Sequence, residues 1–437
     1  MNGQAIQRLR DRQSMRAAAN NIILHLHPTR VPAAALRFTY TWGLGGIAAL
    51  LTVMLVVTGV LLVFRYEPTV DRAYLSIQAL EAQVLFGALI RSIHHWSGNF
   101  LVVVAFLHLL RVFFTGGYKQ GRAVNWVVGL FLLVLVLVFN FTGYLLPWDQ
   151  LAYWAATVGT SLLDYIPLVG VTAVAFLRGG PEVGQATLSN FYAIHVAVLP
   201  VLLAILLSYH FWRIRKDGGI SQPTPPPETT VQKLTTIPHL VQREMAVAVV
   251  VITAVTLWAM FIPAPLEELA NPLQSPNPAK AAWYFLGLQE LLLHLPPRAL
   301  MALIAVVSAA LGLLPYWDRQ EETIGHYFQS HTGRRAALAG LLLGLSLPPL
   351  LIAADEYWLN LPAWLPAWPT IVTAEAIPLL LTLAGLVVIY FVTRLLLKAN
   401  HSEGLVGLFT FVMTSLVVLT AVGIFCRGPN MALVLPF

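Results

Sequence analysis

Nine apolar runs of near membrane-spanning length constrain this sequence more than any other feature. A helix needs about 20 predominantly apolar residues to cross a bilayer. Charged residues make up only 11% of the chain, whereas soluble domains carry about 25%. The sequence therefore predicts an all-α fold, a polytopic membrane helical bundle with about nine transmembrane helices. The expected spans cover residues 40–64, 89–114, 124–145, 192–213, 244–262, 298–315, 335–354, 375–398 and 405–425.

The positions of lysine and arginine predict the orientation. Of the 26 such residues, 19 lie before the first span or in alternate connections between spans. Cytoplasmic segments carry such an excess, so we expect a cytoplasmic N-terminus in a bacterial cytoplasmic (inner) membrane. The net charge of +6 then reflects topology, and no nucleic-acid partner is expected. The N-terminal segment contains the arginines Arg8, Arg10, Arg12 and Arg16 but no apolar run before residue 40. A cleaved signal peptide is therefore not expected.

The single cysteine, Cys426, restricts the redox chemistry available to the chain. One thiol cannot form an intrachain disulfide, hold a cysteine-ligated iron–sulfur cluster or provide the C-x-x-C-H motif of c-type haem attachment. Any redox centre in the membrane must therefore use other ligands.

Five of the twelve histidines lie inside two of the expected spans, where ionisable side chains are costly and usually functional. They are His94, His95 and His108 in one span, and His195 and His210 in another. At about 100° per residue, the histidines 14 or 15 residues apart share a helix face, whereas His95 faces elsewhere. Each such pair is roughly 21–23 Å apart along its helix, too far for one metal. Two antiparallel helices would therefore form two sites stacked through the membrane.

Facing imidazoles in an apolar cavity are typical of haem iron held by two histidines. Glycines support this interpretation, because a missing side chain lets a macrocycle lie against the backbone. Two haem b groups would carry electrons across the membrane. The alternatives are histidines that hydrogen-bond between helices and a transporter with a histidine proton relay. The glycines lie 14 residues apart in each of two spans: Gly45 with Gly59, and Gly129 with Gly143.

Three segments carry a resemblance to a known family. They read RSIHHWS at residues 91–97, FTGYLLPWDQ at 141–150, and RGG followed by VGQATL between residues 178 and 188. These segments are similar to the haem and quinol-site segments of cytochrome b from the Rieske/cytochrome b complexes of the bc and bf types. The motifs cover residues from about 38 to 318. The 15-residue spacing between His195 and His210 resembles that of the bf type.

The resemblance implies two haem b groups with two histidine ligands each, and it assigns a role to two arginines. Arg91 and Arg111 stand where arginines bind haem propionates, with snorkelling to the membrane interface as the alternative. Gly43 stands where bf-type chains carry the cysteine of a third haem, so no covalent third haem is expected. The implied ligand pairs are His94 with His195 for the outer haem and His108 with His210 for the inner haem.

The sequence departs from the family at the quinol-oxidation segment. The family carries Pro-Glu-Trp-Tyr, with the glutamate as proton acceptor, where this chain has Ala281-Ala282-Trp283-Tyr284. Glu290 follows Trp283 by seven residues and shares its face if the segment is helical. We therefore expect Glu290 to replace the missing base, with a glutamate that only faces lipid headgroups as the alternative.

Other residues are expected to line two quinone sites. Near the outer site, Asp149 and Tyr284 are the polar groups, and Trp148 and Trp283 would shape an apolar wall. Near the inner haem, a quinone would need hydrogen-bond donors and a proton path. The candidates there are His27, Lys216 and Asp217.

The resemblance also predicts the domain organisation. It implies a di-haem four-helix bundle at residues 1–216, a cytoplasmic linker at 217–236 and a quinol-site part at 237–320. Additional transmembrane helices follow at 321–437. The chain thus resembles a bf-type cytochrome b fused to its short partner subunit and extended.

The function implied is a subunit of a quinol:cytochrome c, or related acceptor, oxidoreductase. Quinol would be oxidised outside, with one electron passing to a Rieske iron–sulfur protein and one to haem b, and quinone would be reduced on the cytoplasmic side, coupled to proton translocation. Expected partners are the Rieske protein, a c-type cytochrome, quinone, the lipid bilayer and a second copy of the complex. An alternative is a haem b membrane anchor that passes electrons from a periplasmic dehydrogenase to quinone.

Overall fold

The computed structural model describes residues 27–119, 121–222, 232–319 and 324–434. Within these ranges, nine helices are long and apolar enough to cross a membrane. This confirms the all-α, polytopic bundle expected from the apolar runs. The early arginines and the prolines at 223 and 225–227 lie outside the described residues.

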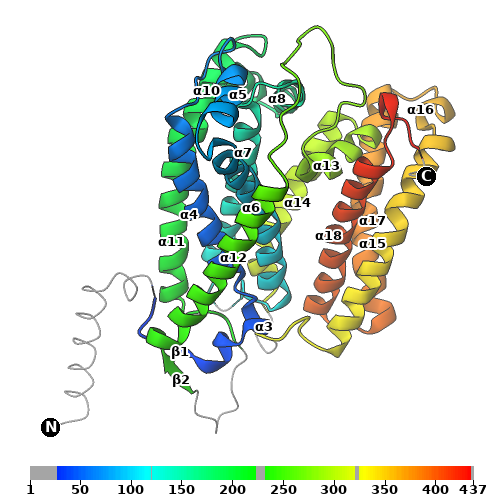
Figure 1. The fold of residues 1–437 in the computed structure, drawn as a ribbon. Coiled ribbons are helices and arrows are strands. Elements are labelled where there is room, and N and C mark those ends of the chain that lie inside the picture. Colours follow the sequence, from blue (N-terminus) through cyan, green and yellow to red (C-terminus); the bar gives the residue numbers. More distant parts are fainter. Residues whose placement is uncertain (1–26, 120, 223–231, 320–323, 435–437) are drawn as a thin grey trace.

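Four spans form one bundle in the first half of the chain (Figure 1). Within it, α4 packs on α6, α6 on α7, and α7 on α11. Side chains such as Val56 and Val60 remain exposed on its surface, which suits contact with lipid tails. The spans are α4 (Leu44–Val63), α6 (Gly87–Phe114), α7 (Ala123–Leu145), and the continuous run of α10 (Gln185–Ala193), η2 (Ile194–Val198) and α11 (Leu199–Lys216).

Short helices cover the end of this bundle that lies away from the N-terminal segment, and we call this end the opposite face. They are α5 (Ala73–Gln83), α8 (Gln150–Leu163) and α9 (Gly170–Arg178). Asp149 caps α8, because its carboxylate accepts a hydrogen bond from the Ala152 amide at 2.9 Å. Its other carboxylate oxygen accepts from the Glu267 amide at 3.2 Å. This one side chain therefore joins the first half of the chain to the connection that precedes α13.

The other end carries the N-terminal segment and is called the N-terminal face. Strands β1 (Arg30–Pro32) and β2 (Lys233–Thr235) pair antiparallel there, with Arg30 opposite Thr235. The start of the first span is thus tied to the start of the fifth. Between β1 and α4 lie η1 (Ala33–Leu36) and α3 (Phe38–Thr41).

The second half of the chain supplies five further spans and the two shorter helices α13 and α16. Helix α12 packs on α4 and α6, α13 packs on α18, and α15 lies along α18 (Figure 1). Small residues let α15 and α18 approach closely, since a Cβ on Gly340 would lie 2.2 Å from the Gly407 carbonyl oxygen. The elements are η3 (Thr236–Leu240), α12 (Val241–Phe261), α13 (Trp283–His294), α14 (Pro297–Trp317), α15 (His331–Tyr357), α16 (Leu361–Trp364), η4 (Ile371–Ala376), α17 (Ile377–Leu397), α18 (His401–Phe425) and η5 (Pro429–Met431).

Candidate functional site

His94 of α6 and His195 of η2 face each other inside the bundle, toward the opposite face. Their ring centroids are 6.3 Å apart, and the ring planes are inclined by 71°. Each imidazole lies where a side chain from the neighbouring helix would otherwise be. A Cβ on Gly59 would lie 3.1 Å from His94 Cε1, and one on Gly143 would lie 2.6 Å from His195 Cε1. The two glycines are therefore required for the positions of the two rings.

Two threonines define which nitrogen of each ring is free. Thr58 Oγ1 lies 2.9 Å from His94 Nδ1, and Thr142 Oγ1 lies 3.1 Å from His195 Nδ1. Each threonine hydroxyl already donates its single hydrogen to a carbonyl of the preceding helical turn. The threonine oxygen must therefore accept from Nδ1–H. Both histidines thus carry their proton on Nδ1 and leave the Nε2 lone pair available to a metal.

A second pair, His108 and His210, lies deeper toward the N-terminal face. A Cβ on Gly45 would lie 3.5 Å from His108 Cε1, and one on Gly129 would lie 3.7 Å from His210 Cε1. The two imidazoles are close enough to interact electrostatically. All four expected glycines therefore lie against a histidine ring, one on each.

The two helices carry their histidines at unequal spacing, and a turn of π-helix accounts for the difference. His94 and His108 are 14 residues apart, whereas His195 and His210 are 15 apart. His195 lies in η2, a π-helical turn between α10 and α11. Such a turn accommodates one extra residue without ending the helix. The π-helical turn explains how the longer spacing still places both histidines on the bundle interior.

Arg111 of α6 is the buried cation nearest to the second pair in sequence. The residue is 8% exposed, and its Nη2 atom has no partner among the described residues. The guanidinium lies 4.9 Å from the Tyr40 ring centroid, and Nε donates to the Tyr40 carbonyl at 3.4 Å. A buried, unsatisfied guanidinium N–H is costly unless an anion binds it. The environment of Arg111 therefore fits a carboxylate ligand such as a haem propionate.

Arg91 is buried to the same degree as Arg111, but its guanidinium already has partners within the protein. Its guanidinium forms an ion pair with Glu81. It also donates to the carbonyls of Ala264 at 3.0 Å and Pro265 at 2.6 Å. Arg91 therefore holds the connection after α12 against α6 in this structure.

Trp283, Tyr284 and Asp149 lie toward the opposite face of the four-span bundle that carries the paired histidines. Trp283 Nε1 donates to Asn99 of α6 at 2.7 Å, and Tyr284 packs among apolar residues of α4, α6 and α7. Burial raises the pKa of Tyr284, and nearby Tyr144 adds to the rise. Burial also raises the pKa of the Asp149 carboxyl, although two backbone amides oppose the change. Trp148, beside Asp149, is 6% exposed and belongs to the apolar core there.

Glu290 lies on α13, as the helical expectation requires, but it faces the C-terminal helices. The residue is 1% exposed. Its carboxylate accepts from Arg427, with 2.6 Å between Nη2 and Oε1, and lies 3.4 Å from His294 Nε2. No contact with Trp283 or Tyr284 is among its described interactions.

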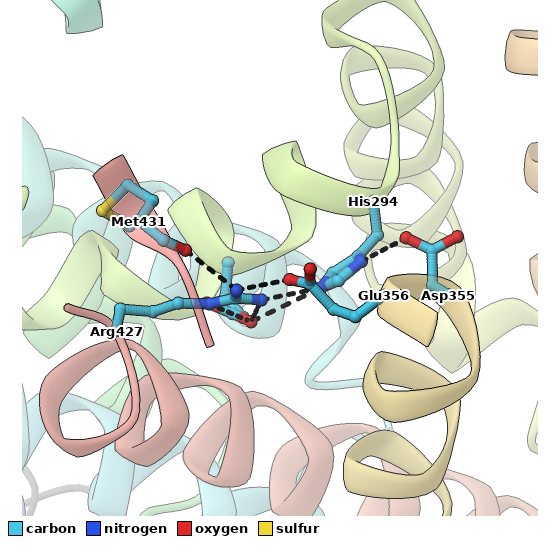
Figure 2. A network of polar contacts seen from close by, with 6 residues as sticks. His294, Asp355, Glu356, Arg427 and Met431 are labelled. Carbon is cyan, nitrogen blue, oxygen red and sulfur yellow. Dashed lines mark hydrogen bonds and ion pairs between the residues drawn. The ribbon is translucent and has the colours of Figure 1, made fainter. Parts of the chain in front are cut away.

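Figure 2 shows the polar network that links Arg427 to Glu356 and Met431, and His294 to Asp355, whose side chain is 42% exposed. Arg427 also forms an ion pair with Glu356 and donates to the Met431 carbonyl at 2.9 Å. His294 Nδ1 lies 2.6 Å from an Asp355 carboxylate oxygen. The network therefore joins α13, the end of α15 and the segment after α18.

Charge and hydrogen bonding set the protonation of this network. Burial alone would raise the pKa of Glu290, but hydrogen bonds with His294 and Arg427 hold it below its ordinary value. Burial alone would lower the pKa of His294, but hydrogen bonds with Glu290 and Asp355 raise it above its ordinary value. The folded state therefore favours an ionised Glu290 and a protonated His294.

The three candidates near the N-terminal face have separate partners. His27 Nε2 lies 3.2 Å from Glu244, and Asp217 forms an ion pair with Arg213 at 3.0 Å. Lys216 Nζ lies 4.8 Å from the Trp212 ring centroid. The second carboxylate oxygen of Asp217 is buried and has no partner among the described residues. Of the three, Asp217 alone has a buried polar atom left over for a ligand.

Sequence reasoning missed two threonines and one arginine of these sites. Thr58 and Thr142 each precede a glycine that lies against a histidine, so the repeated Thr-Gly pair was an available signal. Arg427 follows directly on the last apolar run. Its role could not be recognised, because Glu290 lies 137 residues earlier in the chain.

The fold and the paired histidines define a class of polytopic helical membrane proteins that bind metal-centred cofactors between helices. A sequence profile of the family described as Cytochrome b/b6/petB matches residues 31–218. Cytochrome b6 of Heliomicrobium gestii is 44% identical over 197 residues, which cover 45% of this chain and 90% of that protein. Cytochrome b6 of Porphyra purpurea is 47% identical over 175 residues, covering 40% of this chain and 81% of that protein.

The chain belongs to the cytochrome b/b6 family and is an integral membrane protein. A solved structure titled "Hyperthermophilic respiratory Complex III" matches 88% of this chain and 91% of that chain, with a TM-score of 0.61 and 21% identity. This likeness concerns the fold and extends it beyond the part that the family profile matches. Members of the family bind haem b, and the free Nε2 atoms, the glycines and the unsatisfied Arg111 fit that group.

Replacing Gly143 by alanine should lower the haem b content of the purified protein. The new Cβ would lie 2.6 Å from His195 Cε1, so the imidazole must move, and overpacking of this kind costs about 1–3 kcal/mol. Haem per chain, measured as the pyridine haemochrome, checks the prediction. Gly46→Ala is the matched control, because a Cβ there meets nothing within 4 Å. Equal haem content in both variants would contradict the prediction.

The raised pKa of His294 predicts that stability declines as pH rises. A group whose pKa is raised by folding stabilises the folded state fully when the pH is below its pKa in the unfolded chain, which is 6.5 for histidine. It loses that contribution as the pH rises through its pKa in the folded chain. Hydrogen bonds to charged groups contribute about 1.5–3 kcal/mol, so the apparent melting temperature in detergent should fall over this window. His294→Gln should remove the dependence, and exposed His239→Gln should retain it. A flat wild-type profile would show that His294 does not bind the extra proton.

Proposed function

We propose that this chain is the di-haem cytochrome b subunit of a respiratory or photosynthetic quinol:acceptor oxidoreductase. The observation that carries the proposal is the arrangement of four histidines in two levels, each ring against its own glycine. His94 with His195 would hold one haem b, and His108 with His210 the other. When bound, the two haems supply one-electron redox centres at two depths of the bilayer, tuned by axial ligands and burial.

The protein groups around each level have distinct roles in this proposal. Thr58 and Thr142 keep the proton of their histidines on Nδ1, so Nε2 is the ligating atom at the first level. At the second level, Arg111 would neutralise a propionate with its unsatisfied Nη2. The apolar helices exclude water, which strengthens electrostatic interactions and limits side reactions.

Quinol would be oxidised at the opposite face, which we place outside the cytoplasm. Trp148 and Trp283 would form apolar walls, and Tyr284 with Asp149 would provide polar groups. One electron would leave to a Rieske iron–sulfur partner, which passes it to a c-type cytochrome or a related acceptor. The other would enter the cytochrome b subunit, so that the two electrons of one quinol take separate routes.

Glu290 is the proposed acceptor of a quinol proton, because Ala282 removes the family's usual carboxylate. Arg427 keeps Glu290 ionised and hence able to accept a proton. The same charge lowers the carboxylate's affinity for that proton, which costs driving force. Asp149 is the other buried carboxylate near this end of the bundle, and its raised pKa makes it the competing candidate.

At the N-terminal face, which we place in the cytoplasm, quinone would be reduced and take up protons. Asp217, with its unpartnered carboxylate oxygen, His27 and Lys216 are the proposed polar groups of that site. Each charge moved across the membrane against the potential requires about 2.3 kcal/mol per 100 mV. Oxidation outside and reduction inside would therefore store energy as a proton gradient. We further propose that the complex is a homodimer in the bacterial inner membrane.

A second candidate function follows from the same substitution at Ala282. Without the usual carboxylate, the chain could serve as a haem b anchor that passes electrons from a periplasmic dehydrogenase to quinone. The subunits that co-purify with the chain distinguish the two: a Rieske protein supports the first function, and a molybdopterin or nickel subunit supports the second.

The purified polypeptide should contain two protohaems per chain. The pyridine haemochrome assay measures this ratio, and the reduced-minus-oxidised spectrum should show paired b-type bands. Replacing any one of the four histidines by alanine should remove about one haem. A wild-type value of one or zero would refute the di-haem proposal.

Glu290→Gln should slow quinol oxidation by roughly 100-fold or more, the usual contribution of a general base. The rate is measured in the purified complex with its acceptor partners present. Glu356→Gln is the matched control, because it also removes a carboxylate from Arg427 but leaves Glu290 in place. Unchanged quinol oxidation in Glu290→Gln, together with a loss in Asp149→Asn, would assign the proton to Asp149 instead.

A further inference from the structure

The connection between α14 and α15 reaches back to the haem-type bundle, although it lies more than a hundred residues beyond the part that the family profile matches. Gly325 N donates to the Thr115 carbonyl at 2.8 Å, and Phe328 N donates to the Phe114 carbonyl at 2.9 Å. Both acceptors lie at the end of α6, the helix that carries His108 and Arg111. Residues 324–330, which we call the return segment, are thus hydrogen-bonded to the end of α6 that lies at the N-terminal face, just beyond the second histidine level.

The return segment lies in the chain between a buried ion pair and the start of α15. Six residues before its first residue, Asp318 forms an ion pair with Lys119 at 2.9 Å, and both side chains are at most 1% exposed. At its other end, Ser330 caps α15 and hydrogen-bonds to Glu403 of α18. Between these anchors, Phe328 and Gln329 adopt left-handed backbone conformations with φ of 59° and 68°. Such conformations are costly for residues other than glycine and persist only where the surroundings impose them.

Tyr327 is the residue of the return segment that contacts the surroundings of Arg111. Its hydroxyl donates to the Tyr40 carbonyl at 2.9 Å, and the two rings meet edge to face at 6.4 Å between centroids. The same Tyr40 carbonyl accepts from Arg111 Nε at 3.4 Å. The Tyr327 oxygen is also close enough to interact favourably with the Arg111 guanidinium. Tyr327 and Tyr40 therefore hold one edge of Arg111 and leave Nη2 without a partner.

We propose that Tyr327 is a positioning residue that orients the Arg111 guanidinium toward the inner haem of this chain. The proposal rests on the di-haem function set out above. A cation held beside a haem favours its reduced state, because reduction adds an electron and the attraction grows in a medium of low dielectric constant. Hydrogen bonding around a haem is among the means by which proteins set its potential. The return segment thereby adjusts the inner haem from a part of the chain outside the four-helix bundle.

The test is the midpoint potential of each haem in Tyr327→Phe, determined by redox titration of the α-bands in the purified complex. The inner-haem potential should shift to a more negative value, because Arg111 is held less firmly, and the outer-haem potential should stay at the wild-type value. Tyr316→Phe is the matched control, because Tyr316 is exposed at the end of α14 and has no contact with Arg111 among those described. It should leave both potentials unchanged.

A double variant distinguishes orientation of Arg111 from a general loss of packing. Arg111→Gln should lower the inner-haem potential further, and adding Tyr327→Phe to it should cause no additional shift. Tyr327→His keeps a ring and a hydrogen-bonding atom, and should lie closer to the wild-type potential than Tyr327→Phe. If Tyr327→Phe does not assemble, Arg111→Gln decides the matter, because an unchanged inner-haem potential in that variant would overturn the proposal.

The possible results separate the two proposals. A wild-type protein without two haems would refute the di-haem function itself. Two haems in the wild type, with an unchanged inner-haem potential in Tyr327→Phe, would overturn the role of Tyr327 alone. Additive shifts in the double variant, or equal shifts in Tyr327→Phe and Tyr327→His, would also overturn it, because they would show an effect that does not pass through the hydroxyl and Arg111.

Discussion

The placement of four imidazoles inside a bundle of apolar helices is the constraint on which the rest of this structure depends. A polar ring in hydrocarbon is costly unless its hydrogen-bonding atoms are satisfied. At the first level, Thr58 and Thr142 satisfy Nδ1, and Gly59 and Gly143 provide the space for the rings. What remains is one nitrogen lone pair per ring, and a metal between the rings can satisfy both.

A buried charge cluster joins α13 to the C-terminal helices at the opposite face. Arg427 and Glu290 are almost completely inaccessible and form an ion pair, and Glu356 and His294 complete the set of charged groups around them. Removing one partner of such a pair leaves an uncompensated buried charge, which usually costs several kcal/mol. The network thus fixes α13, which carries Tyr284, relative to the C-terminal helices. The geometry of the proposed quinol site therefore depends on residues far from it in sequence.

The chain beyond residue 320 makes polar contacts with two distant parts of the structure. Residues 324–330 are hydrogen-bonded to the end of α6, and the segment after α18 supplies the cation that neutralises Glu290. Residues 324–330 lie at the N-terminal face, and the segment after α18 lies at the opposite face. The C-terminal part of the chain thereby contacts α6 beyond the second histidine level and α13 at the opposite face.

The sequence by itself determined the nine spans, the pairing of the histidines into two levels and the glycines beside them, because hydrophobic length and helical periodicity are local properties of the chain. Only the tertiary structure decided which nitrogen of His94 and His195 is free, since that depends on threonines from other helices. It also decided that Arg427 and His294 are the partners of Glu290. Helical periodicity gives the direction of a side chain on its own helix, but its partner is set by how distant helices pack, which no local pattern encodes.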